Sequence, residues 1–123
     1  MRLALQNGDI RLDLLPARGG GVGQLRWRGH DIFRAADSGH DPLQLANFPL
    51  IPFCNRIGHC QFDDRGRTIT LPVTHEQAES EHSLHGLGWI NPWTVESSDA
   101  SSAALSHSHD GSIWPWAYQA RQI

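Results

Sequence analysis

The stretch "RLALQNGDIRLDLL" constrains the fold more than any other part of this sequence. Two runs of alternating apolar and polar residues flank an Asn-Gly dipeptide, Asn7-Gly8, which is a strong signal for a tight β-hairpin. The apolar residues of the second run are two positions apart and so share one face: Ile10, Leu12 and Leu14. The chain must therefore bury one face of a hairpin and leave the other face to solvent.

Short strands predominate along the rest of the chain, and no segment has a helical apolar period. The 123 residues include 12 glycines and 7 prolines, a composition that favours turns over long helices. We expect irregular structure at residues 35–46 and a polar loop at 74–83. The pattern predicts an all-β antiparallel sandwich and a single domain spanning residues 1–123. Further strands are expected at residues 24–29, 31–34, 60–62, 67–73, 93–97, 103–109 and 116–122.

Three consecutive glycines, residues 19–21, interrupt the alternation between the first two predicted hairpins. Glycine permits backbone angles that are closed to other residues, so a phosphate-binding loop is one interpretation. Such a loop needs a helix to follow it, and none is indicated here. We therefore expect no phosphate site.

Charge and composition exclude several classes of protein. The formal net charge is -3, and all ten basic residues are arginine, so a catalytic or phosphate-binding lysine is excluded on this chain. No cationic stretch favours nucleic acid, and no apolar stretch is long enough to cross a membrane or to act as a leader. We expect Cys54 and Cys60 to be buried free thiols, which points to a reducing compartment and a cytoplasmic location.

The segment "NFPLIPFCNRIGH", residues 47–59, contains the first candidate binding residues, Asn55 and Arg56. Pro49 and Pro52 stiffen the apolar run that precedes them. The arginine fork offers five donors and the asparagine amide both donates and accepts, which suits a ligand rich in hydroxyl groups. The alternative is a structural arginine paired with a nearby carboxylate.

His85 lies in "HSLHGLGW", among small residues that would let a ligand approach closely. A neutral imidazole has one nitrogen free for a hydroxyl group while the other is held. The alternative is a core histidine bonded to the backbone.

Two further patterns favour structural over functional interpretations. His107 and His109 point the same way on a predicted strand and could ligate a metal, but no glutamate follows to complete the site, so we expect solvent-facing histidines and no metal. Trp114 and Trp116 could stack on a sugar ring, and we expect them instead to plug one end of the sandwich.

The ordered motifs "FPLIPFCNRIG", "LHGLGW" and "WPWAYQA" resemble the aldose 1-epimerase (galactose mutarotase) family, and the likeness runs along nearly the whole chain. The resemblance implies a β-sandwich of the galactose mutarotase type, of which this chain is an N-terminal part. It also implies a reaction that interconverts the α and β anomers of a free aldose sugar by acid and base ring opening, without a cofactor.

The same resemblance implies that Asn55, Arg56 and His85 contact the sugar, with His85 near the ring oxygen as the catalytic candidate. The family's principal acid, a second histidine, and its base, a glutamate, lie downstream of the matched stretch, so this chain would carry only part of the active site. A local substitute would be a glutamate–histidine pair from the polar loop. The glutamates of that loop are Glu76, Glu79 and Glu81.

Two alternatives to an epimerase remain at this stage. One is a non-catalytic carbohydrate-binding module of the same fold, and the other is a small metal-binding sandwich that uses His107 and His109. Because part of a sandwich leaves an apolar face uncovered, we also expect this chain to self-associate or to be marginally stable.

Overall fold

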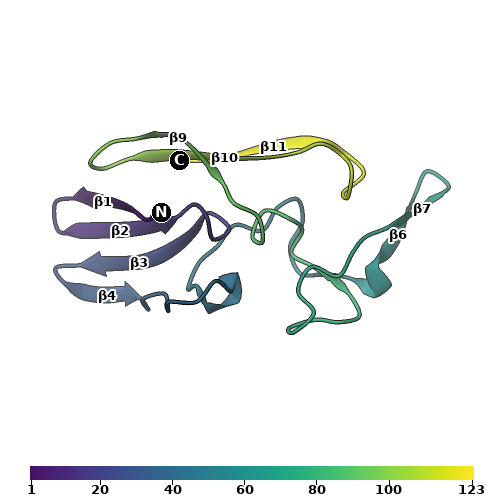
Figure 1. Cartoon of the computed structure of the whole chain (residues 1–123), viewed down its shortest axis with the longest axis horizontal. Coiled ribbons are helices and arrows are strands. Elements are labelled where there is room, and N and C mark those ends of the chain that lie inside the picture. The colour runs from purple at the N-terminus through teal and green to yellow at the C-terminus, as the bar shows by residue number, and fades with distance from the viewer.

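The computed structural model describes all residues from 1 to 123 and is built almost wholly from β-strands (Figure 1). Two antiparallel sheets form its main part. The first has the order β1-β2-β3-β4, and its strands are β1 (Leu3–Asn7), β2 (Ile10–Leu15), β3 (Gly21–Trp27) and β4 (His30–Phe33). The second has the order β11-β10-β9, and its strands are β9 (Thr94–Ser98), β10 (Ala103–His109) and β11 (Tyr118–Gln122). The predicted fold class, an all-β antiparallel architecture, is confirmed.

Two short strand pairs occupy the middle of the chain, and one of them projects from the body as a hairpin (Figure 1). That hairpin consists of β6 (Gln61–Asp64) and β7 (Arg67–Thr70). The other pair joins β5 (Arg56–Ile57) to β8 (Ser83–Leu84). The only helical segments are two single 3₁₀ turns, η1 (Pro42–Gln44) and η2 (Gly58–Cys60). No helix has the length and apolarity needed to cross a membrane.

The predicted opening hairpin is present, with Asn7 paired to Ile10 across a loop of Gly8 and Asp9. The burial predicted from the alternation in its second strand is confirmed on one face of the strand and not on the other. Leu12 and Leu14 face the space between the two sheets, as predicted. On the opposite face Asp13 is only 2 % exposed, where the pattern predicts solvent. Long arginine side chains cover its carboxylate, with ion-pair distances of 3.6 Å to Arg2 and to Arg11.

The glycine run packs against the rest of the chain, and its last residue already belongs to strand β3 rather than to a loop. Gly19 has a φ of 63°, and a Cβ atom there would lie 2.0 Å from the backbone oxygen of Trp89. Glycine is therefore required because the loop presses directly onto the backbone of a distant segment. This close approach explains the run without a phosphate ligand.

The core lies where the two sheets and the middle segment meet. Trp89 and Leu105 are fully buried, and Trp93 is nearly so. Trp93 ties the region together, because its backbone N–H donates to Pro16 and its indole N–H donates to Gly88. Burial of two tryptophans of this size supplies much of the hydrophobic stabilisation available to a chain of this length.

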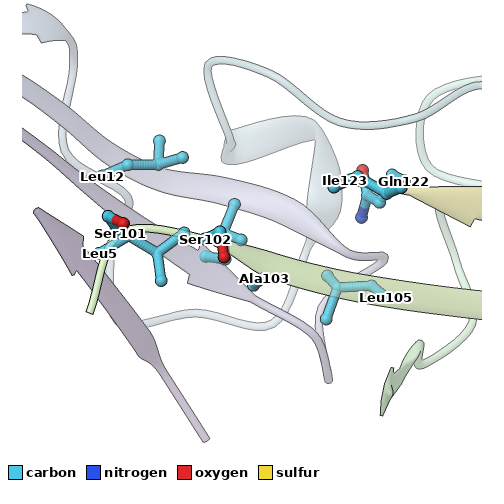
Figure 2. A pocket seen from close by; sticks show the side chains of 9 residues that line it. Leu5, Leu12, Ser101, Ser102, Ala103, Leu105, Gln122 and Ile123 are labelled. Atoms are coloured by element: carbon cyan, nitrogen blue, oxygen red, sulfur yellow. The ribbon is translucent and has the colours of Figure 1, made fainter. Parts of the chain in front are cut away.

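An apolar cavity of about 310 Å³ lies between the two sheets and is open to solvent (Figure 2). Side chains from β1, β2 and β10 line it together with the end of β11. The cavity is an apolar surface that the chain leaves partly open between its two sheets. Self-association through such a surface stays a prediction. Its apolar lining consists of Leu5, Leu12, Leu14, Ala103, Leu105 and Ile123.

Candidate functional site

Strands β5 and β8 bring the three predicted sugar-contacting residues together, although His85 follows Arg56 by 29 positions and Asn55 by 30. Arg56 pairs with Leu84 in the ladder, so Asn55 and His85 lie next to each other at its end. Two hydrogen bonds then link that pair. The backbone N–H of His85 donates to the Asn55 carbonyl at 2.9 Å, and the backbone N–H of Asn55 donates to His85 Nδ1 at 2.8 Å. The position of the imidazole is thus fixed by the backbone of the residue beside it.

The proline-braced segment and the "LHGLG" turn are in direct backbone contact. The Ile51 carbonyl accepts from the N–H groups of Leu87 at 2.7 Å and Gly88 at 2.9 Å, and the Ile51–Pro52 peptide bond is cis. Gly86 of the turn packs directly against the proline-braced segment. Its φ is 69°, and a Cβ atom there would be 2.3 Å from the Ile51 oxygen. A glycine is therefore needed for the two halves of the site to meet.

Trp89 supports the turn that carries His85. Its indole ring is stacked between Phe48 and His75, with centroid distances of 5.7 and 5.6 Å, and it is fully buried. The indole N–H donates to the carbonyls of Leu84 and Gly86, at 3.1 Å each, which are the residues on either side of His85. His85 meets the same ring edge-on at 5.7 Å. This buried clamp holds the imidazole between a fixed ring and a fixed backbone.

The hydrogen bond at Nδ1 defines the protonation state of His85. Because Nδ1 accepts from a backbone N–H, the neutral ring carries its proton on Nε2. Burial, with a further contribution from the positive charge of Arg56, lowers the pKa of His85 below its ordinary value of 6.5. At neutral pH this residue is an uncharged Nε2–H donor, suited to an ether or hydroxyl oxygen.

This assignment predicts how His85 titrates. We expect ¹⁵N–¹H spectra to show an Nε2–H tautomer and a pKa below 6.5 for this ring. Because the unfolded chain takes up the proton at a higher pH than the folded one, His85 should make stability fall as the pH drops below 6.5. An Nδ1–H tautomer for His85 would contradict the assignment.

Asn55 and Arg56 present only part of their hydrogen-bonding groups to solvent. Asn55 has a left-handed backbone with a φ of 66°, and its Oδ1 accepts from the Arg56 backbone N–H at 2.9 Å. Its Nδ2 amide remains for a ligand. Arg56 forms an ion pair through Nε with Glu79, which bears out the carboxylate pairing considered from sequence, yet its side chain is half exposed. Pairing and accessibility therefore coexist at this arginine.

The structure does not form the glutamate–histidine pair considered for the polar loop. The Glu79 carboxylate accepts from Arg56 and from the Glu81 backbone N–H, and these hydrogen bonds lower its pKa. A carboxylate held in this way is a poor proton acceptor. No hydrogen bond joins the carboxylate of Glu76, Glu79 or Glu81 to a histidine side chain, so the local substitute considered from sequence is not formed.

Left-handed backbone conformations gather around this site. Six non-glycine residues of the chain have a positive φ, and four of them belong to it or flank it. Asparagine and histidine are enriched in this region among non-glycine residues, whereas cysteine adopts it less readily. Such strain is most common where side chains serve a function. The four residues are Asn55, His59, Cys60 and His85.

The three candidate residues lie on an open surface. None of Asn55, Arg56 and His85 lines any of the cavities of the structure, and the apolar cavity of Figure 2 lies elsewhere, between the sheets. Asn55 and Arg56 are exposed, and His85 is half-buried. A ligand would therefore meet a shallow, polar surface on this chain.

The histidines of β10 are engaged within the protein, which corrects the expectation that they face solvent. His107 Nε2 lies 3.0 Å from the Tyr118 hydroxyl, and His109 Nε2 accepts from the Trp114 backbone N–H at 3.0 Å. Burial lowers the pKa of His107. No group of three metal-ligating side chains occurs in the chain, so the geometry gives no support to the metal hypothesis.

Two further expectations are also corrected. Trp116 is 45 % exposed and so does not plug the fold, although it and the half-buried Trp114 each contact the Phe62 ring in a tilted arrangement. Cys54 is exposed and Cys60 is half-buried, so the two free thiols are not core residues.

Comparison with known proteins places this chain in one family. The sequence profile of the aldose 1-epimerase family matches residues 1–123, and the chain belongs to that family. A relative in Escherichia coli K12, the uncharacterized protein YphB, is 30 % identical over 111 residues, which are 89 % of this chain and 37 % of that protein.

Solved structures agree with this assignment. A crystal structure assigned as an aldose 1-epimerase from Escherichia coli K12 superposes with a TM-score of 0.89 at 26 % identity, covering 99 % of this chain and 40 % of that one. Galactose 1-epimerase from Lactobacillus acidophilus shares the fold, with a TM-score of 0.70 at 19 % identity and coverage of 98 % and 39 %. The predicted galactose mutarotase type of fold is thus confirmed, and the chain spans about 40 % of the length of these relatives.

Proposed function

We propose that this chain forms part of the sugar-binding site of an aldose 1-epimerase, within a galactose mutarotase-like domain that includes residues 1–123. The family assignment supports a carbohydrate epimerase or mutarotase role. The observation that carries the site is the reciprocal hydrogen bonding of Asn55 and His85 next to an accessible Arg56. These groups present an amide, an imidazole N–H and a guanidinium on one surface, which suits the hydroxyl groups of a pyranose.

In this proposal each of the three side chains has a distinct task. Arg56 and the Nδ2 amide of Asn55 bind sugar hydroxyl groups, while the Nε2–H of His85 donates to the ring oxygen. Ring opening needs a base that takes the proton from the C1 hydroxyl and an acid that delivers one to the ring oxygen. C1 then turns about its bond to C2, and the ring closes on the other face. His85 stabilises charge that develops on the ring oxygen by hydrogen bonding.

A non-catalytic carbohydrate-binding role is the second candidate, and one observation favours it. Within residues 1–123, two titratable groups beside the site already have partners in the protein. His85 accepts a hydrogen bond at Nδ1, and Glu79 is paired with Arg56. Neither is placed as an acid and base on opposite sides of an anomeric carbon. Binding without turnover would distinguish this candidate from the epimerase.

Substitution of the site residues tests both candidates. We expect Arg56→Ala and His85→Ala each to weaken binding of D-galactose or D-glucose at least tenfold, since each removes a hydrogen bond to the sugar. Chemical-shift titration measures binding, and polarimetry of freshly dissolved α-anomer measures mutarotation. The exposed Arg67 and His40 provide the controls Arg67→Ala and His40→Ala, which should behave like the parent. Unchanged binding in both site variants would remove the proposed site.

We also propose that the protein works in the cytoplasm on a free aldose. Two free thiols, at Cys54 and Cys60, support a reducing compartment.

A further inference from the structure

The polar loop between β7 and β8 reaches across to the candidate site through a single side chain, Glu79. The loop is anchored independently of that contact. Thr74 Oγ1 donates to the Leu84 carbonyl at 2.7 Å, and His75 Nε2 lies 3.1 Å from Asp41 Oδ1. At the far end, His82 Nδ1 accepts from the backbone N–H of His59 at 3.0 Å. Cys60 Sγ also donates to the Glu81 carbonyl at 3.6 Å, so the loop has four attachments besides Glu79.

The contact between Glu79 and Arg56 has more effect on the arginine than on the loop. Ion pairs with half-exposed members contribute little to stability, and this loop is already held elsewhere. Arg56, by contrast, has a long side chain that loses much rotamer entropy when a ligand has to order it. Only 13 % of the Glu79 side chain is exposed, so the carboxylate is the fixed member and the guanidinium is the oriented one.

The contact also selects which edge of the guanidinium meets a ligand. Glu79 occupies Nε, and Asn55 Oδ1 lies 3.4 Å from Nη1 on the other side. The fork is thereby held through two of its nitrogens, and the edge that includes Nη2 has no side-chain partner for that nitrogen. A ligand that binds this edge does not need to order the side chain, and preorganisation of this kind increases affinity.

We propose that Glu79 is a positioning residue for Arg56, and that the loop of residues 74–82 is thereby part of the sugar site. The inference rests on the proposed function, because Arg56 must be a sugar ligand for its orientation to matter. Glu79 itself contacts no substrate in this scheme. It acts by holding the guanidinium, and substitution should change affinity rather than the fold.

The test compares Glu79→Gln, Glu79→Asp and the matched control Glu76→Gln, which removes the same charge from an exposed position on the same loop. We expect Glu79→Gln to weaken D-galactose binding about tenfold, because the charge-assisted hydrogen bond that orients Arg56 is lost. Glu79→Asp should restore part of the affinity, and Glu76→Gln should equal the parent. Chemical-shift titration gives each dissociation constant.

A spectroscopic signature separates positioning from a general structural effect. The Nε–H resonance of Arg56 should be sharp in the parent and in Glu76→Gln, and should broaden or disappear in Glu79→Gln while the backbone spectrum is retained. Equal sugar affinity in the parent and Glu79→Gln would overturn the role of Glu79 alone. No sugar binding by the parent would overturn the proposed site, and with it this inference.

Discussion

Gly86→Ala should abolish sugar binding and lower the free energy of unfolding by about 3 kcal/mol. Two independent effects add at this position. The residue has a φ of 69°, which costs an alanine about 1–2 kcal/mol, and the new Cβ would lie 2.3 Å from the Ile51 oxygen. The turn must then move away from the proline-braced segment, which separates His85 from Asn55. Urea unfolding and sugar titration measure the two consequences.

Substitutions at two other glycines distinguish the cost of a left-handed backbone from the cost of a steric clash. Gly66 has a φ of 78° with open space around its Cβ direction, so Gly66→Ala should cost only about 1 kcal/mol. Gly58 has neither constraint, and Gly58→Ala should change stability by less than about 0.5 kcal/mol. If Gly86→Ala resembled Gly66→Ala in both stability and sugar binding, the close backbone approach would not be what assembles the site.

Trp89→Phe should lower the free energy of unfolding by about 2–3 kcal/mol and displace His85. The substitution keeps an aromatic ring in the stack but removes the N–H that donates to Leu84 and Gly86. It also leaves unfilled volume beside a fully buried position. Thermal unfolding reports the stability loss, and a shift of the His85 ring resonances with weaker sugar binding reports the displacement.

A second tryptophan serves as the control for that substitution. Trp27 is 47 % exposed, and Trp27→Phe should change stability by less than about 0.5 kcal/mol and leave His85 unmoved. A Trp89→Phe protein as stable as Trp27→Phe, with parent-like His85 resonances, would show that the indole N–H does not hold the turn.

Local patterns were enough to predict most strands of the two main sheets. Alternation of apolar residues and turn dipeptides act over a few positions, so the hairpins of β1 with β2 and of β9 with β10 were predictable. The start of β3 at Gly21 was not, because the glycine run is selected by contacts with segments far away in sequence, Gly19 with Trp89 and Gly21 with Leu45. Burial of Asp13 likewise depends on two arginines folding over it.

The site was predictable in part for a similar reason. The motifs around Asn55 and His85 are local and informative, and the structure brings these residues together across β5 and β8. Glu79 carries no sequence signal of its own, since one glutamate of three in a polar loop looks like the others. Glu79 is the one that reaches Arg56 because of the path that the loop takes. The tautomer of His85 equally required knowing which backbone N–H faces Nδ1.

The left-handed residues around the site have a consequence for how such a protein changes over generations. At Asn55, His59, Cys60 and His85 a glycine would adopt the same backbone angles more easily, so the present side chains are retained against a conformational preference. In a descendant that no longer used the ligand, replacement of these residues by glycine would relieve the backbone strain. Persistence of bulky side chains at these four places in a duplicated gene would therefore mark continued use of the proposed sugar site.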